Sequence, residues 1–266
     1  MQHLIREAFM KNTDASSKIV ELDNVVESLD TESSRPRKGI YLLPNLLTTG
    51  ALFGGFFAVL SGFNGGFELA AIAIFVAMVF DGLDGRVARM TNTQSDFGVQ
   101  YDSLSDMVSF GVAPAVVVYG WSLESLGKVG IAAAFVYASC AALRLARFNV
   151  QSGISSNKFF IGLPSPAAAA LIAGFVWSAQ SLESSLWLSC LTALLTACAG
   201  LLMVSNFKYP SFKSIDLRGK VPFVVILSIV MSFVVITIDP PRILLMLSLG
   251  FALYAPAKFL WSRFNG

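Results

Sequence analysis

The sequence predicts an all-α fold, a polytopic bundle of about eight transmembrane helices. Hydrophobic residues make up 55% of the 266 residues and charged residues only 14%, whereas a soluble domain carries about 25% charged residues. Long apolar runs alternate with short polar breaks along most of the chain, and about 20 apolar residues suffice to cross the hydrocarbon core of a bilayer. Too little polar sequence remains to cover the surface of a soluble protein of this size.

Residues 1–38 form a polar leader. They contain no apolar stretch of the kind found in a cleavable signal peptide. Ile19, Leu22, Val26 and Leu29 recur at helical spacing, which is typical of a short amphipathic helix on a membrane surface. A flexible tail explains the leader equally well.

Apolar segments fill the rest of the chain, six within residues 39–220 and two within residues 221–266. Pro164 opens the fifth segment, since proline is tolerated in the first turn of a helix. The last two segments are joined at 239–242 by Asp-Pro-Pro-Arg, which is typical of a tight turn. The segments cover about residues 41–61, 67–84, 100–121, 129–148, 164–181, 185–205, 221–238 and 241–260.

The distribution of lysine and arginine predicts that both termini face the cytoplasm. With the N-terminus inside, only Lys128 and Arg242 of the 19 basic residues fall in the outside loops. Because cytoplasmic loops of membrane proteins carry an excess of these residues, this split favours an even number of spans.

Composition also disfavours several classes of function. Nucleic-acid binding finds no support, because the net charge is only +2. The single histidine, His3, lies in the polar leader, which argues against histidine-based acid–base or zinc chemistry. Cys140, Cys190 and Cys198 lie inside apolar runs without metal-ligand spacing, so they are expected to be small buried hydrophobic residues.

Four aspartates lie where the second segment ends and the third begins. Asp81 and Asp84 are three residues apart on one predicted helix. Asp102 and Asp106 are four residues apart on the next one, so the members of each pair share a helix face. Two antiparallel neighbouring helices would thus direct four carboxylates at one point. Charged residues at membrane depth are costly, so this cluster predicts a functional site.

Four carboxylates this close would repel one another and bind protons unless cations neutralised them. Oxygen ligands favour Mg²⁺ or Mn²⁺ over zinc, and two such ions would bridge a diphosphate and stabilise a leaving group. Arg89 would pair with phosphate oxygens, while the nearby glycines would let a ligand approach the backbone. Alternatively, the aspartates only pair with Arg86 and Arg89, which leaves two carboxylates unmatched and the glycines without a purpose.

These residues match the signature of the CDP-alcohol phosphotransferase family, which the chain resembles over about residues 40–260. The signature reads D-x-x-D-G-x-x-A-R, eight residues, G, three residues, D, three residues, D. Its eight fixed positions across 26 residues are all present here, so chance agreement is not a serious rival. They are Asp81, Asp84, Gly85, Ala88, Arg89, Gly98, Asp102 and Asp106.

The resemblance implies a role for each position of the signature. All four aspartates contact divalent metal, and Asp106 is also the base that takes the proton from the acceptor alcohol. It further implies a six-helix catalytic core open to the cytoplasm, two Mg²⁺ or Mn²⁺ ions, and a homodimer. The residues that shape the CDP pocket are Gly85, Ala88, Arg89 and Gly98.

Other motifs resemble the bacterial phosphatidylserine synthase branch of this family. Asn45 and Thr48 begin the first segment beside the predicted site, where they contact nucleotide or phosphate or simply start a helix. Arg144 and Arg147 end the fourth segment on the same side, where they bind the serine carboxylate or only mark the cytoplasmic face. The motifs are the stretches 43–48, 103–111, 144–149, 162–166 and 205–213.

The resemblance therefore implies an enzyme surrounded by lipids of the bacterial cytoplasmic (inner) membrane. It would transfer the phosphatidyl group of CDP-diacylglycerol to L-serine, giving phosphatidylserine and CMP. Alternative acceptors are glycerol 3-phosphate, an inositol phosphate and choline, and CDP-ethanolamine with diacylglycerol is an alternative substrate pair. A cation transporter is a remote alternative, because its site should lie near the bilayer midplane between two matching halves. The chain contains no second copy of the aspartate cluster.

Overall fold

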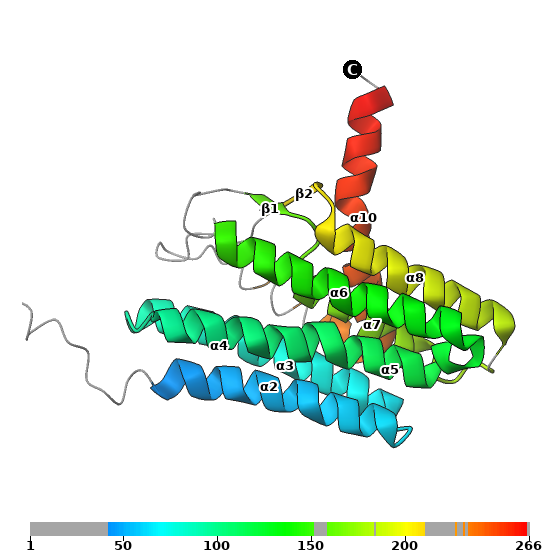
Figure 1. Cartoon of the computed structure of the whole chain (residues 1–266), viewed down its shortest axis with the longest axis horizontal. Helices are drawn as coiled ribbons and strands as arrows, with labels where there is room; N and C mark the ends of the chain where they lie inside the picture. Colours follow the sequence, from blue (N-terminus) through cyan, green and yellow to red (C-terminus); the bar gives the residue numbers. More distant parts are fainter. Residues whose placement is uncertain are drawn as a thin grey trace, which may run out of the picture.

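The computed structural model describes residues 42–151, 159–183, 185–210, 227, 231 and 234–264. Most of its helices run side by side along one direction, and two short strands pair above them in the view of Figure 1. The elements are α2 (Leu42–Phe63), α3 (Phe67–Met90), α4 (Asp96–Asp106), the π-helix η1 (Met107–Val112), α5 (Ala113–Trp121), the 3₁₀-helix η2 (Leu123–Leu126), α6 (Lys128–Gln151), β1 (Phe159–Ile161), α7 (Ser165–Ala179), α8 (Leu186–Val204), β2 (Lys208–Pro210) and α10 (Pro240–Phe264).

The helices correspond to the predicted apolar segments, which confirms the all-α membrane bundle. Five stretches are long and apolar enough to cross a membrane. α3 has 24 residues, but it carries several charged side chains, Asp81 and Asp84 among them, and α7 has only 15 residues. The predicted segment 221–238 lies largely outside the described residues, as does the leader, 1–38. The five stretches are Leu42–Phe63, Asp96–Trp121, Lys128–Val150, Leu186–Val204 and Pro240–Phe259.

α4, η1 and α5 form one continuous rod whose middle is a π-helix that begins directly after Asp106. Pro114, just beyond η1, has no N–H to donate to the carbonyl of Phe110, four residues earlier. That carbonyl accepts a 3.0 Å hydrogen bond from the hydroxyl of Tyr137 on α6. The irregular turn therefore leaves this buried carbonyl satisfied, as buried backbone groups must be.

Both α3 and α4 pack against α2. Gly55 of α2 lies so close to η1 that a Cβ atom there would be 2.6 Å from the Cα of Ser109. The Ser109 hydroxyl donates to the carbonyl of Ala51 at 2.9 Å, and the Ser105 hydroxyl donates to that of Thr48 at 3.1 Å. Small and hydroxyl side chains are the usual means by which membrane helices approach closely. These contacts fix α4, and the aspartates that it carries, relative to α2.

β1 and β2 form an antiparallel pair that ties the α6–α7 connection to the segment after α8. Gly162 follows β1 with a φ of 80°, and a Cβ atom there would overlap the carbonyl oxygen of Met203, so only glycine fits. Its N–H donates to the carbonyl of Phe207 at 2.8 Å. The beginning of α7 is therefore held against the end of α8.

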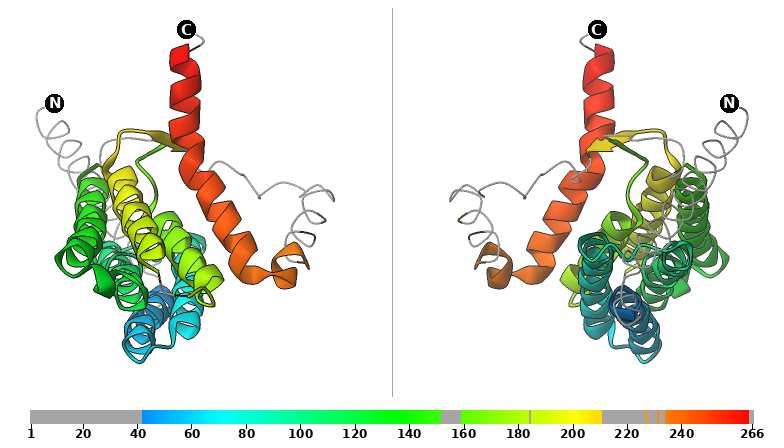
Figure 2. Two further views of the ribbon diagram at one scale, coloured as in Figure 1. Left: turned by 90° about the vertical axis from the view of Figure 1, so that its right-hand side faces the viewer. Right: turned by 90° about the vertical axis from the view of Figure 1, so that its left-hand side faces the viewer.

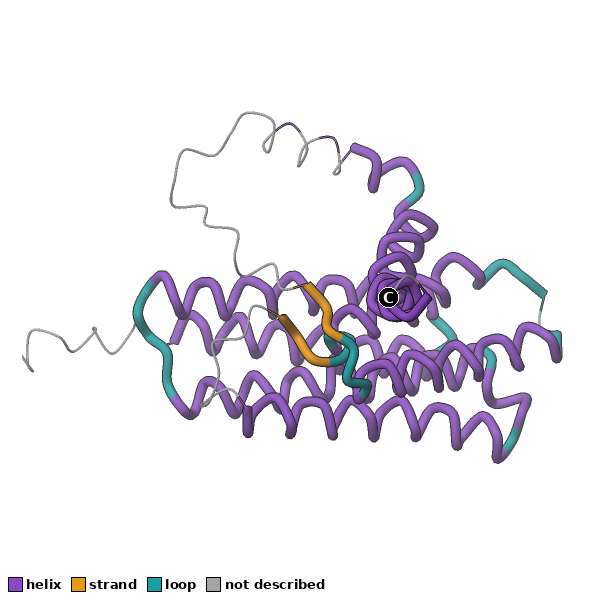
Figure 3. Tube along the Cα trace, turned by 90° about the horizontal axis from the view of Figure 1, so that it is seen from above, coloured by secondary structure: helices purple, strands orange, loops and turns teal. Residues whose placement is uncertain are grey.

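α10 bends midway, and its C-terminal half projects from the bundle across the direction of the long helices (Figures 1, 2 and 3). Pro256 lies inside α10, and a proline inside a helix removes one backbone hydrogen bond and bends the helix. The N-terminal half packs against α7, where Gly174 lets the backbone of Leu245 come close.

The cysteines follow the prediction only in part. Cys140 is buried, but Cys190 and Cys198 are exposed on α8. The prediction was wrong for these two because a membrane helix also carries apolar side chains on its outer face, as the exposed Leu191 and Leu194 of the same helix illustrate.

Candidate metal-binding active site

Three aspartates converge near the end of the bundle where α3 is joined to α4. Asp81 lies in the C-terminal half of α3, while Asp102 and Asp106 lie on α4. One carboxylate oxygen from each of the three lies within 4.8 Å of the other two. The four-residue spacing on α4 places both of its carboxylates on the face toward Asp81. The predicted convergence is therefore observed for three of the four aspartates.

The fourth aspartate, Asp84, is buried and makes a different contact. Its Oδ2 accepts a 2.6 Å hydrogen bond from the hydroxyl of Thr48 on α2. The Asp84 charge still interacts electrostatically with Asp102, so Asp84 lies beside the cluster. Thr48, predicted to contact nucleotide or phosphate, is thus placed where it orients a candidate metal ligand.

The donor set fits a divalent cation. All candidate ligand atoms are carboxylate oxygens, which Mg²⁺ and Mn²⁺ prefer. Oδ1 of Asp102 is buried without a hydrogen-bond partner, a costly arrangement unless a cation or a proton compensates it. The single ion pair within the described residues joins Arg242 to Asp239. Direct pairing of the aspartates with Arg86 and Arg89, the alternative explanation of the cluster, is therefore not observed.

Arg144 approaches the cluster from α6. Its guanidinium is close enough to Asp81 and Asp106 for charge–charge interaction. Its Nη1 donates a 2.8 Å hydrogen bond to the hydroxyl of Ser165, the first residue of α7. The structure thus brings Arg144 to the candidate site, as the sequence predicted.

Arg147, one turn further along α6, is directed elsewhere. It donates to the carbonyl of Val204 at 3.5 Å and to Oδ1 of Asn206 at 3.0 Å. These acceptors lie at the C-terminus of α8, where the helix dipole favours a positive charge. The structure therefore does not bring Arg147 together with the aspartates, and its hydrogen bonds stabilise the end of α8.

The two candidate CDP-binding glycines differ in the space beside them. An added Cβ atom on Gly85 would meet only Nη1 of Arg89, at 3.6 Å, and one on Gly98 would meet only side-chain atoms of Ser95 and Asn45. Neither glycine is needed for a positive φ or for a close helix contact. The space beside Gly85 is free for a ligand, whereas the Ser95 hydroxyl, at 3.2 Å from an added Cβ atom, occupies part of the space beside Gly98. Ala88 is partly buried on the same helix as Arg89.

Sequence reasoning missed two serines that shape the site. The hydroxyl of Ser95 accepts a 3.0 Å hydrogen bond from the N–H of Gly98 and so caps α4, which a serine three residues before Gly98 could have indicated. Ser165 bonds Arg144 across 21 residues of sequence. No local pattern predicts such a contact.

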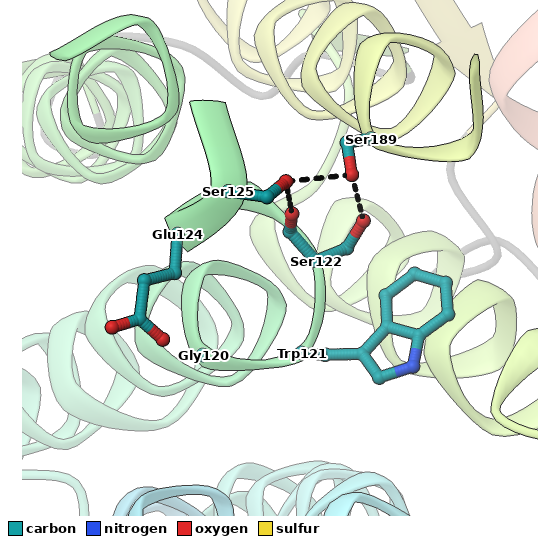
Figure 4. A pocket seen from close by; sticks show the side chains of 6 residues that line it. All are labelled: Gly120, Trp121, Ser122, Glu124, Ser125 and Ser189. Carbon is teal, nitrogen blue, oxygen red and sulfur yellow. Dashed lines mark hydrogen bonds between the residues drawn. The ribbon is translucent and has the colours of Figure 1, made fainter. Parts of the chain in front are cut away.

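A separate pocket lies at the opposite end of the α4–α5 rod. Its lining residues come from the end of α5, from η2 and from α8 (Figure 4). Ser189 accepts hydrogen bonds from Ser122 at 3.2 Å and from Ser125 at 2.9 Å. The pocket is lined by one carboxylate, Glu124, and by none of the aspartates of the cluster, so the two sites are separate.

An apolar helix bundle with converging carboxylates defines an integral membrane protein that has a candidate divalent-metal site. Such sites commonly act on phosphorylated substrates. The chain belongs to the CDP-alcohol phosphatidyltransferase family, whose model matches residues 41–203. The matched region contains all four aspartates of the signature, so the predicted family is confirmed.

Curated relatives cover most of the chain. It is 38% identical over 205 residues to a CDP-diacylglycerol–serine O-phosphatidyltransferase of Helicobacter pylori. This alignment covers 75% of the present chain and 84% of the relative. It is 42% identical over 187 residues to a Methanocaldococcus jannaschii protein of the same name, covering 70% and 82%. It is 36% identical over 170 residues to the archaetidylserine synthase of Methanothermobacter thermautotrophicus, covering 63% and 69%.

Proposed function

We propose that the protein transfers the phosphatidyl group of CDP-diacylglycerol to the hydroxyl of L-serine, giving phosphatidylserine and CMP. The observation that carries this proposal is the convergence of three carboxylates beside the guanidinium of Arg144. In such a set, the carboxylates would hold the metal ions that bind a diphosphate, and the guanidinium would bind the carboxylate of the acceptor beside it. The relatives from H. pylori and M. jannaschii are named for the same donor and acceptor.

In this proposal Asp106 is the base. The serine hydroxyl oxygen attacks the phosphorus nearest the diacylglycerol, and its proton passes to the Asp106 carboxylate. The new oxygen–phosphorus bond forms as the bond to CMP breaks, and Arg89 stabilises the charge on the departing CMP. Two divalent ions, Mg²⁺ or Mn²⁺, held by the four aspartates of the signature would neutralise the diphosphate and polarise its phosphoryl oxygens. Positioning and preorganised charge supply most of the rate enhancement.

Arg144 is the proposed partner of the acceptor carboxylate. A phosphorylated acceptor such as glycerol 3-phosphate would require several cations beside the aspartates. Among the described residues, Arg89 interacts with Asp84 and Arg144 with the cluster, whereas Arg147 is engaged with α8. A single guanidinium beside the cluster, that of Arg144, favours a small zwitterion such as serine.

The proposal extends to the surroundings of the site. The bias of lysine and arginine supports a site and both termini on the cytoplasmic side, and the bacterial inner membrane is proposed from the resemblance to the bacterial branch of the family. Thr48 is proposed to act on the CDP moiety through its hydrogen bond to Asp84. The residues proposed to contact the CDP moiety directly are Asn45, Gly85, Ala88, Arg89 and Gly98. A homodimer is proposed from the family alone.

CMP release by the purified protein in detergent tests this function. The assay supplies CDP-diacylglycerol and Mn²⁺ or Mg²⁺, with serine, glycerol 3-phosphate, inositol, inositol phosphate and choline offered in turn. Release with serine alone, abolished by a chelator, is the expected result. Release with another alcohol would retain the chemistry and overturn the acceptor, and no release with any of them would overturn CDP-diacylglycerol as the donor.

A further inference from the structure

The guanidinium of Arg144 has one edge engaged and one edge free. Nη1 donates to the hydroxyl of Ser165 at 2.8 Å. Nε is buried without a hydrogen-bond partner, and Nη2 has none among the described residues. The N–H groups of Nε and Nη2 point the same way, and together they form the fork that binds a carboxylate or phosphate through two parallel hydrogen bonds.

Ser165 is held rigidly where it meets Arg144. Its side chain is fully buried, so it cannot touch a substrate. Pro164 and Pro166 flank it in the sequence and restrict the backbone on either side. The preceding residue, Leu163, donates from its N–H to the carbonyl of Leu202 at 3.0 Å, which anchors this turn to α8.

We infer that Ser165 is a positioning residue, which holds Nη1 of Arg144 so that the Nε–Nη2 edge receives the carboxylate of the acceptor amino acid. This inference rests on the proposed function. The same edge would also suit a phosphate oxygen of the CDP-linked donor, because both groups are oxyanions. A carboxylate is favoured because Arg144 faces Asp106, the proposed base for the acceptor, from α6.

Steady-state CMP release by detergent-solubilised full-length protein separates these cases. The KM for serine, the KM for CDP-diacylglycerol and kcat are measured for wild type, Ser165→Ala, Ser165→Thr and Arg144→Lys. Ser178→Ala is the matched control, because Ser178 lies on the same helix and its hydroxyl only donates to the carbonyl of Phe175.

The Ser165→Ala variant is expected to raise the KM for serine about tenfold, as the loss of a hydrogen bond to a charged group predicts. Its kcat and its KM for CDP-diacylglycerol should stay within about twofold of wild type, as should all constants of Ser178→Ala, because neither change touches groups that bind the donor. Ser165→Thr retains the hydroxyl, so its KM for serine should stay close to that of wild type. Arg144→Lys keeps the charge but loses the fork, so it should also raise the KM for serine.

Two competitors identify the group that the fork binds. L-alanine carries the carboxylate without the hydroxyl, so its inhibition should weaken about tenfold in Ser165→Ala, in parallel with the KM for serine. Ethanolamine lacks the carboxylate, so its weaker inhibition should be unchanged.

Three results would overturn the inference. An unchanged KM for serine in Ser165→Ala would show that the hydroxyl does not position Arg144. A raised KM for CDP-diacylglycerol instead would assign the edge to the donor phosphate, and a fall in kcat with a lowered Tm would assign a structural role. Wild-type protein without serine-dependent CMP release would overturn the proposed function itself, which is a different outcome from an active wild type with an unaffected variant.

Discussion

The hydroxyl of Tyr209 donates a 2.9 Å hydrogen bond to the carbonyl oxygen of Ala252 in α10. This carbonyl lies four residues before Pro256, which has no N–H to offer it. Burial raises the pKa of Tyr209 to about 12, so the phenol keeps its proton, and remains a donor, at any pH below that value. The buried tyrosine on β2 thus compensates the carbonyl that the proline leaves free, at the place where α10 bends.

The same arrangement recurs next to the candidate site. Tyr137 is also fully buried, and it donates to the carbonyl of Phe110, four residues before Pro114. In both cases a proline breaks the helical pattern and a tyrosine from another element satisfies the freed carbonyl. Only the pair at Phe110 lies in the rod that carries Asp102 and Asp106.

The two tyrosines are therefore expected to differ in their effect on activity. Tyr209→Phe and Tyr137→Phe should each lower the free energy of unfolding by about 1–3 kcal/mol, because each leaves a buried carbonyl without its donor. Tyr137→Phe should also reduce CMP release at a temperature where the protein stays folded, since it loosens the turn after Asp106. Thermal unfolding in detergent and the CMP assay measure the two effects, with the exposed Tyr254→Phe as control. Equal activity in both buried variants would mean that η1 does not position the aspartates.

The contact between Gly55 and η1 provides a second prediction. Gly55→Ala would place a Cβ atom 2.6 Å from the Cα of Ser109, so η1 and α2 must separate. Both stability and CMP release should fall. Gly250→Ala is the matched control, because that glycine lies in α10 with open space around an added Cβ atom, and it should gain up to about 1 kcal/mol of helix stability. A stable and fully active Gly55→Ala protein would show that the close approach is not required.

The sequence allowed the cluster to be predicted because its geometry is local. Residues four apart on a helix share a face whatever the rest of the fold does, so Asp102 and Asp106 could be placed together without a structure. Their meeting with Asp81 required only that consecutive helices run in opposite directions. The signature and the apolar segments were sufficient for the fold class and the family.

Contacts between segments distant in sequence could not be predicted in this way. Asp84 bonds Thr48 because α2 passes beside α3, and Arg147 reaches the end of α8 rather than the aspartates. Both outcomes depend on which helices become neighbours and where each ends. The π-helix after Asp106 was not predicted either, because an inserted residue leaves no clear trace in the pattern of apolar residues.

The bond from Thr48 to Asp84 leads to a prediction about metal affinity. Partners that orient a metal-binding carboxylate typically contribute a factor of about 10 to 100 to affinity. Thr48→Val keeps the shape but removes the donor, so Mn²⁺ binding measured by electron paramagnetic resonance should weaken about tenfold. Thr48→Ser should retain it. Thr196→Val is a matched control, because the Thr196 hydroxyl bonds only the carbonyl of Thr192 within α8. Unchanged Mn²⁺ affinity in Thr48→Val would show that Asp84 does not bind the metal.

The role of Asp106 as base is tested by separating binding from turnover. Asp106→Asn keeps the size and an oxygen ligand but cannot accept the proton of the acceptor hydroxyl, so CMP release should fall by about 10²–10⁴-fold, the usual contribution of general base catalysis. CDP binding in the presence of Mn²⁺, measured by titration calorimetry, should persist, because Asp81 and Asp102 still supply carboxylates. Asp96→Asn, in the exposed first turn of the same helix, controls for the loss of one negative charge on α4. Near-normal turnover in Asp106→Asn would remove this residue from the base role, whereas loss of both turnover and CDP binding would assign it to holding the metal alone.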